Sequence, residues 1–283
     1  HRSHGPQRAL LKADDASVCL ECHVGARKAR AGGKSHHAPF QTGRCWSCHE
    51  PHANARKSLL AKEPKELCLS CHEGLRKRLA EPKAVVHSAV GDGECDDCHA
   101  GHGSAVEALL VEEQPKLCAG CHDVEGEAVR KVHAGYPVVE ARCTGCHDPH
   151  VSRNPKLVAD VGHPPFADRD CSTCHAPPPD ARKTVAPLKR NILAECDNCH
   201  EFAARAKAVT VAHAPVKAGR CFDCHSPHAA SREHLLLRAQ PALCYDCHEK
   251  ARAAFEQPFV HTAVKRGACT VCHAVHGGQE KKL

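Results

Sequence analysis

Apolar residues come in short groups along this chain, and polar or charged stretches separate them. No run of 18 or more apolar residues occurs, so no segment is expected to cross a membrane as a helix. The strongest helical stretches are short and cover residues 67–80, 196–209 and 244–255. Glycine-bearing turns follow at several places, and alternating patterns typical of strands are rare. The pattern predicts a mostly irregular chain with short α-helices and little or no β-sheet.

The composition does not provide an ordinary hydrophobic core. Leu, Ile, Val and Phe together make up about 18% of the 283 residues, aromatic residues make up 3%, and Met is absent. Chains below about 20% in those four residue types rarely bury enough apolar surface to fold alone. We therefore expect a cofactor to fill the interior.

All 22 cysteines lie in C-x-x-C pairs, and a histidine directly follows every pair. The eleven pairs are Cys19 and Cys22, Cys45 and Cys48, Cys68 and Cys71, Cys95 and Cys98, Cys118 and Cys121, Cys143 and Cys146, Cys171 and Cys174, Cys196 and Cys199, Cys221 and Cys224, Cys244 and Cys247, and Cys269 and Cys272. The following histidines are His23, His49, His72, His99, His122, His147, His175, His200, His225, His248 and His273.

The C-x-x-C-H motif is typical of covalent c-type haem attachment. The two thiols add to the two vinyl groups of the porphyrin, and the adjacent histidine binds the iron as its proximal ligand. Zinc ribbons need four ligands per metal and no following histidine, and disulfides within each pair would close only small rings. The sequence thus predicts eleven covalently bound haem c groups as cofactors, with no catalytic residues.

The motifs repeat every 23–28 residues and alternate between two kinds. A full motif has another histidine three residues after its own and one upstream, whereas a plain motif has neither. The full motifs begin at Cys45, Cys95, Cys143, Cys221 and Cys269, and the plain ones at Cys19, Cys68, Cys118, Cys196 and Cys244. A full motif and the next plain motif form a two-haem repeat, joined in three cases through a Leu-Leu pair, so we expect a linear array of stacked haems.

The Cys171 motif interrupts this alternation. It has an upstream histidine, but prolines 177–179 stand where the later histidine would be. We place a junction there and predict an N-terminal tail over residues 1–18, a six-haem segment over 19–162 and a five-haem segment over 163–283, in one continuous array. A simple insertion in a linker is the alternative.

The pattern H-x7-CxxCHxxH, then Leu-Leu, then LCxxCH resembles the doubled-CXXCH multihaem cytochromes over residues 19–276. That family includes periplasmic electron carriers, porin-embedded outer-membrane conduits and extracellular cytochrome filaments. The resemblance implies electron transfer as the function and leaves open which of those roles applies.

The histidines outside the motifs can supply the distal ligands. Eleven of them follow the repeat: His37, His52, His87, His102, His133, His150, His163, His213, His228, His261 and His276. One assignment has each upstream histidine bind its own motif's haem and each later histidine bind the preceding plain haem. In the alternative, each later histidine binds a haem further along the chain, which requires an exchange of ligands between subunits. His36 and His234 are interpreted as structural, while His1 and His4 are open.

This ligand count argues against an enzyme, because it leaves no iron open to a substrate. The cations near the plain motifs, such as Arg76, Lys77 and Arg78, either lie on solvated helix faces or pair with haem propionates. Each oxidised haem adds about −1, so the apo net charge of +6 becomes about −5 and gives no support for nucleic-acid binding.

We expect an undecahaem cytochrome that conducts electrons by hopping between haems. Covalent haem attachment takes place outside the cytoplasm, which places the chain outside the cell or at its surface, or else in the periplasm or outer membrane. The expected partners are other copies of the chain in a filament, redox-partner cytochromes or extracellular acceptors. A porin-embedded or periplasmic conduit and a multihaem reductase are the alternatives.

Overall fold

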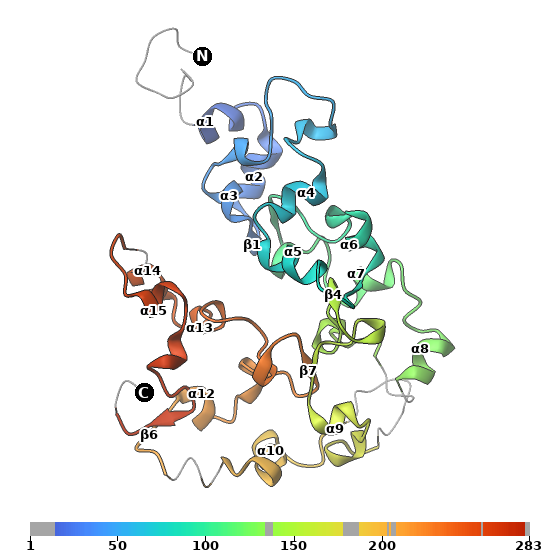
Figure 1. The fold of residues 1–283 in the computed structure, drawn as a ribbon, viewed down its shortest axis with the longest axis vertical. Helices are drawn as coiled ribbons and strands as arrows, with labels where there is room; N and C mark the ends of the chain where they lie inside the picture. Colours follow the sequence, from blue (N-terminus) through green and yellow to red (C-terminus); the bar gives the residue numbers. More distant parts are fainter. Residues whose placement is uncertain are drawn as a thin grey trace. The chain divides into compact units, whose positions relative to one another are not determined.

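The structure is a computed structural model that describes residues 15–133, 138–177, 187–202, 204, 208–255 and 257–280. Short helices joined by irregular segments make up most of it (Figure 1). The α-helices are α1 (Asp15–Leu20), α2 (Val24–Ala31), α3 (Ala38–Gln41), α4 (Pro64–Leu69), α5 (Glu73–Leu79), α6 (Ser88–Asp92), α7 (Lys116–Ala119), α8 (Glu127–Val132), α9 (Pro164–Ala167), α10 (Ile192–His200), α12 (Ala214–Lys217), α13 (Ala242–Tyr245), α14 (Glu249–Phe255) and α15 (Thr262–Lys265). The predicted fold class, mostly irregular with short helices, is confirmed.

Short 3₁₀ helices alternate with them along the chain. Six begin at the first cysteine of a motif: η1 (Cys45–Ser47), η3 (Cys95–Asp97), η5 (Cys143–Gly145), η7 (Cys171–Thr173), η8 (Cys221–Asp223) and η10 (Cys269–Val271). Four lie further along: η2 (Lys57–Leu59), η4 (Glu107–Leu109), η6 (Pro155–Leu157) and η9 (Glu233–Leu235).

The helices predicted after the plain motifs exist but are interrupted. The stretch 67–80 is divided between α4 and α5, and 244–255 between α13 and α14. The break falls at the motif histidine, since His72 has φ −83° and ψ 57°, outside the helical region. In the stretch 196–209, α10 ends at His200 because Glu201 is left-handed, and residues 203 and 205–207 lie outside the described part.

The β-structure consists of strands of two residues each. In three pairs, β1 (Ser35–His36) lies antiparallel to β3 (Gly103–Ser104), β5 (Val161–Gly162) to β7 (Ala229–Ala230), and β6 (Val211–Ala212) to β8 (Gly277–Gly278). The fourth pair is β2 (Val85–Val86) with β4 (Val151–Ser152). These strands are too short to form a sheet layer, but each stands next to a histidine outside the motifs.

The chain forms two contact units. The first contains the residues up to Val124 together with Pro149–Val151, and the second contains Glu125–Asp148 and the residues from Ser152 onward. The predicted junction at the Cys171 motif lies within the second unit and stays a prediction.

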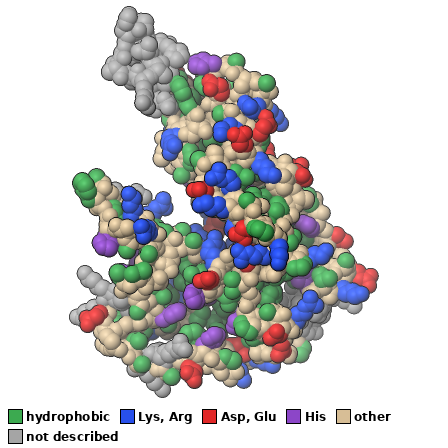
Figure 2. Space-filling view, in the orientation of Figure 1, with side chains coloured by type: hydrophobic (Ala, Val, Ile, Leu, Met, Phe, Trp, Pro, Cys, Tyr) green, Lys and Arg blue, Asp and Glu red, His purple; other side chains and the backbone are tan. Residues whose placement is uncertain are grey.

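The described residues of the two units form almost no hydrophobic core. In the described part of the chain the buried hydrophobic residues are Ala16, Val151, Ala159, Ala229 and Ala230. Charged, polar and histidine side chains share the visible face with apolar ones (Figure 2). No helix in the described ranges is long and apolar enough to cross a membrane. The polypeptide thus surrounds little of its own apolar surface, in line with its composition.

Candidate functional site

Each C-x-x-C-H motif folds into one turn that brings its three reactive side chains together. In ten of the eleven motifs the backbone N–H of the histidine donates to the carbonyl of the first cysteine at 2.9–3.0 Å. Residues three and four positions apart lie on the same side of such a turn. Both thiols and the imidazole of a motif are therefore presented together, as attachment to one macrocycle requires.

The thiols are neither paired nor arranged as metal clusters. All 22 cysteines are free, and each is either partly buried or exposed. Within the described residues, no group of three or more His, Cys, Asp or Glu side chains could hold a metal ion. Burial and the neighbouring Cys95 thiol raise the pKa of Cys68 to about 11, and burial and Cys269 do the same for Cys244. Zinc needs deprotonated thiolates in groups of four, so these sites do not resemble structural zinc sites.

Nine motif histidines face a second imidazole from another part of the chain. The pairs are His49 with His102, His72 with His37, His99 with His150, His122 with His87, His147 with His133, His175 with His228, His200 with His163, His225 with His276 and His248 with His213. Seven pairs lie within 29° of parallel, and the rings of the His87–His122 and His133–His147 pairs are inclined by 64° and 65°. Every pair lies within one contact unit.

The spacing within these pairs fits one iron between two imidazoles. An imidazole nitrogen binds a metal at about 2.0–2.1 Å and lies about 1 Å from its ring centre, so two rings on opposite sides of one metal have centroids about 6 Å apart. The nine separations are 5.9–6.2 Å. Direct stacking would place the rings closer, so the residues present fit a haem iron with two histidine ligands.

Backbone carbonyls orient the motif imidazoles of four of the five full motifs. The Nδ1–H of His49 donates to the carbonyl of Ser58 at 2.9 Å, and His99, His147 and His225 make the same bond to the ninth residue after them, at 2.7–3.0 Å. A carbonyl only accepts, so Nδ1 carries the proton and Nε2 keeps its lone pair for a metal. Such bonds also make a ligand more basic.

The accepting carbonyls belong to residues with left-handed backbone. Ser58, Ala108, Lys156 and His234 have φ of 56–59°, and the leucine after each also has positive φ. None is glycine, and each costs about 1–2 kcal/mol in this conformation. The same strained turn at four sites is a repeated structural feature, and it gives His234 a structural role through its backbone.

Several consecutive motifs lie side by side within one unit. The Cys68 thiol is hydrogen-bonded to the Cys95 thiol, and Cys196 is bonded in the same way to Cys221 and Cys244 to Cys269. The second cysteine of a full motif also lies near that of the next plain motif: burial, and after it the neighbouring Cys71 thiol, raise the pKa of Cys48. Within each unit these attachment points follow one another in sequence order.

The structure changes the expected histidine partners. Each upstream histidine was expected to face its own motif, but only His133 does so, opposite His147. His37 faces the following plain motif at His72 instead. The expected link from His276 to the Cys244 motif is replaced by one to His225. The reason is the pairing of short strands between distant segments, which local spacing does not indicate.

The remaining histidines have different surroundings. His52 lies 3.6 Å from Glu50. The His261 Nδ1 accepts the Ala263 backbone N–H at 3.3 Å, and the His36 Nε2 donates to the Gly32 carbonyl at 2.7 Å. His1 and His4 lie outside the described residues.

Protein groups bind several of the cations near the plain motifs. Arg76 and Lys77 lie 3.6 and 3.3 Å from Glu73 on the surface of α5. The Arg78 guanidinium donates to the carbonyl of Val151. These contacts agree with the interpretation of solvated helix faces, and pairing with propionates stays a prediction.

The comparisons with known proteins agree with the motif geometry. A family model described as the doubled CXXCH motif matches five segments, residues 37–77, 87–127, 136–162, 163–205 and 213–253. A search of curated proteins finds no match. The matched segments cover more than half of the chain, and each contains histidines that belong to the facing pairs. The chain belongs to the doubled CXXCH family of multihaem c-type cytochromes.

Proposed function

We propose that this chain attaches eleven haems c, one at each motif, and passes electrons from one to the next. The observation that carries this proposal is the set of nine imidazole pairs, each 5.9–6.2 Å apart and each beside a C-x-x-C-H motif. A bound haem supplies an iron that takes up and gives up one electron. A motif histidine and a distal histidine would together hold each iron, which would keep substrates from it.

The proposed order of electron transfer follows the sequence within each unit. Contacts between the cysteines of consecutive motifs, such as Cys68 with Cys95, place the edges of neighbouring attachment sites together. Electrons would pass alternately from a full to a plain site and back. All ligands are imidazoles, and Met, which raises haem potentials, is absent from the sequence. We expect low potentials that differ through burial and local charge.

The distal ligand set extends to all eleven sites in this proposal. Nine distal histidines already face a motif histidine, and His52 and His261 are assigned to the remaining two. With every iron bound by two histidines, the chain acts as an electron carrier and does not reduce a small substrate at iron.

Location and assembly are further parts of the proposal. Haem attachment outside the cytoplasm and the family's known roles support an extracellular or cell-surface protein that polymerises into a filament. Redox-partner cytochromes or extracellular acceptors would exchange electrons with it.

The test is to produce the chain in a host that matures c-type cytochromes. We expect a mass increase equal to eleven haems. In concentrated protein, the electronic absorption and paramagnetic resonance spectra should show low-spin haem and no high-spin haem. Fewer than eleven haems would contradict the cofactor count. A whole high-spin haem under these conditions would contradict the complete ligand set and favour a reductase.

A further inference from the structure

Eight of the nine facing histidines outside the motifs belong to a repeated element, which we call the histidine clip. Each clip joins an upstream histidine to a histidine that follows a later full motif: His37 with His102, His87 with His150, His163 with His228 and His213 with His276. The backbone N–H of the first donates to the carbonyl of the second at 2.8–3.3 Å. The two residues before the first histidine also pair with the two residues after the second. A clip therefore fixes two imidazoles through segments far apart in the sequence.

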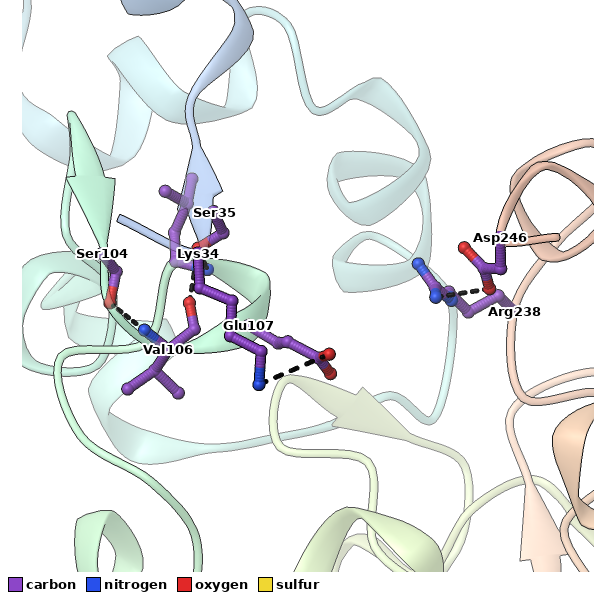
Figure 3. Close-up of polar contacts among 8 residues, drawn as sticks. Lys34, Ser35, Ser104, Val106, Glu107, Arg238 and Asp246 are labelled. Atoms are coloured by element: carbon purple, nitrogen blue, oxygen red, sulfur yellow. Dashed lines mark hydrogen bonds and ion pairs between the residues drawn. The ribbon is translucent and has the colours of Figure 1, made fainter. Parts of the chain in front are cut away.

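Polar side-chain contacts reinforce the first clip (Figure 3). The Ser35 hydroxyl donates to the carbonyl of Val106 at 2.5 Å, and the Ser104 hydroxyl accepts the Val106 backbone N–H at 2.9 Å. Lys34 lies 3.7 Å from Glu107 in the same place. To move a clip histidine away from the motif it faces, hydrogen bonds of this kind and a strand pair must break.

His133, the ninth facing histidine outside the motifs, is not part of a clip. It faces His147 of its own motif, with ring centroids 6.2 Å apart. It ends α8, where it has φ −95° and ψ 19°, whereas the first histidine of every clip precedes a helix with ψ between 125° and 136°. Both imidazoles at the Cys143 motif thus come from one stretch of the chain within one contact unit.

The contacts that hold His133 are local. Its backbone N–H and its Nδ1–H both donate to the carbonyl of Val129, at 3.1 and 2.8 Å, which leaves Nε2 available to a metal. Within the described part of the chain, the hydrogen bonds of residues 127–133 all lie inside residues 126–133. The neighbouring Val132 is 73% exposed. A movement of α8 alone would therefore carry the His133 imidazole away from His147.

The motif side of the same site is held more firmly. The His147 Nδ1–H donates to the carbonyl of Lys156 at 2.9 Å. The next residue, Asp148, is buried, and its carboxylate accepts the Ser231 hydroxyl at 2.5 Å. These bonds connect the motif to two later segments of the same unit. His147 should therefore keep its place when His133 moves.

We propose that the haem at the Cys143 motif, once reduced, binds a neutral diatomic ligand such as carbon monoxide in place of His133. The bond between the iron and the His133 Nε2 breaks, a bond between the iron and the carbon atom forms, and no electron is transferred. His147 stays bound on the other side. This inference rests on the proposed haem attachment, and it leaves the oxidised site with two histidine ligands because carbon monoxide binds ferrous iron only.

The clip histidines compete better with such a ligand than His133 does. A clip stays formed without a bond to iron, so it keeps its imidazole at a high effective concentration beside the metal. His133 depends on a helix of six residues, and helices of that length are only marginally stable by themselves. Access of a ligand to the iron is what separates ligand-binding haems from electron-transfer haems. Among the nine facing pairs, the Cys143 site is the one where this access needs only a local movement.

A bound diatomic ligand would hold an electron at this site. Because the ligand binds the reduced iron and not the oxidised iron, it stabilises the reduced state. The Cys143 motif is the first motif of the second contact unit. In the proposed order of transfer, the ligand would therefore slow the passage of electrons through that unit.

The principal test is a carbon monoxide titration of the reduced, haem-loaded chain, followed by absorption spectroscopy. We expect one carbon monoxide per chain, and a binding rate that becomes independent of its concentration when the departure of His133 is limiting. H133A should still bind one carbon monoxide per chain, but at least about tenfold faster. H213A removes a clip histidine that faces His248, so it should bind a second carbon monoxide per chain.

A second pair of variants keeps every histidine. A128G loosens α8 and should speed the binding about two- to fivefold, because glycine destabilises a helix relative to alanine. The control is A253G, which makes the same change at an exposed position of α14, a helix that holds none of the facing histidines. A253G should bind carbon monoxide at the wild-type rate.

Two results would overturn the proposal. One is a reduced, fully loaded wild-type chain that takes up no carbon monoxide, and the other is uptake of one carbon monoxide that persists in the C143S/C146S variant. The control for that variant is C171S/C174S, which should lose one haem and still bind one carbon monoxide. Haem content is measured by mass in parallel. A wild-type chain without haem at the Cys143 motif would contradict the proposed function itself, whereas a loaded chain that binds no ligand would contradict only this inference.

Discussion

The imidazoles of His37 and His72 lie nearly parallel, 11° apart, with centroids separated by 6.1 Å, although they belong to different motifs. His37 begins α3, and its backbone N–H donates to the carbonyl of His102 at 2.9 Å. The strand pair next to His37 thus fixes the direction of its imidazole. This imidazole faces the motif that follows its own. Each pair of motifs is therefore tied to the next by contacts between histidines as well as by sequence.

Removing the His37 imidazole should open the haem site of Cys68 and not that of Cys45. If haems bind as proposed, we expect H37A to convert one haem to high spin. In a variant that also lacks the Cys68 and Cys71 thiols, H37A should add no high-spin haem. The haem that His37 would bind is already absent from that variant. Paramagnetic resonance counts the high-spin haems in each variant.

The matched control uses the other histidine of the same clip. H102A should add one high-spin haem in both backgrounds, since His102 faces His49. A high-spin signal from H37A in the chain without the Cys68 haem would contradict the pairing.

The sequence is sufficient to predict the paired C-x-x-C-H motifs of this family, because these motifs depend on local spacing. It does not predict the partner of His37, because that partner depends on strand pairing with residues 103–104. It also misses the left-handed turn at residues such as Ala108, since a non-glycine residue gives no local signal for positive φ. The helix expected over residues 67–80 is broken for a similar reason: the geometry of the motif turn at His72 overrides helix propensity.

The strained turn at Lys156 should control the orientation of the His147 imidazole. Lys156 has φ of 59°, and its carbonyl accepts the His147 Nδ1–H at 2.9 Å. K156G should keep this bond and stabilise the fold by up to about 1 kcal/mol. K156V should destabilise it by about 1–2 kcal/mol, because a β-branched residue resists positive φ.

Thermal unfolding of the loaded protein and the paramagnetically shifted NMR signal of the His147 Nδ1–H check this expectation. K57V changes an exposed lysine just before a corresponding turn, where the left-handed residue is Ser58, and should alter neither measurement. Equal stability of K156G and K156V would show that the turn does not constrain the site.

Acid should loosen the turn that carries the Cys171 motif. The Thr173 and Ser172 hydroxyls donate to the Asp170 carboxylate at 2.6 and 2.8 Å, and these bonds lower the pKa of Asp170 below its ordinary value. A carboxylate with a lowered pKa stabilises the folded state above its unfolded pKa of about 3.9, and this contribution is lost as the pH falls through the lower folded value.

Amide hydrogen exchange at Thr173, followed as the pH is lowered from about 5 to 2 and corrected for the intrinsic pH dependence of exchange, should show reduced protection at the acid end. D170N lacks the titrating group and should lose this pH dependence. D168N, at a neighbouring exposed aspartate, is the control that should keep it. The same pH profile in D170N and wild type would assign the effect to another group.

Removing the haems should unfold the chain. Leu, Ile, Val and Phe make up only about 18% of its residues, and the buried hydrophobic side chains of the described part are those of Ala16, Ala159, Ala229, Ala230 and Val151. These small side chains bury too little apolar area to balance the entropy of ordering the chain. Replacing all 22 cysteines by serine would prevent attachment while changing each motif by one atom per cysteine. We expect this variant to show a disordered far-ultraviolet circular dichroism spectrum and no cooperative thermal transition, whereas the loaded wild type melts cooperatively.

Replacing only the Cys118 and Cys121 pair is the intermediate case. This variant should lose one haem and the local order around α7, while the other sites keep their low-spin spectra. A serine variant that unfolds cooperatively would show that the polypeptide, and not the haem, supplies the core.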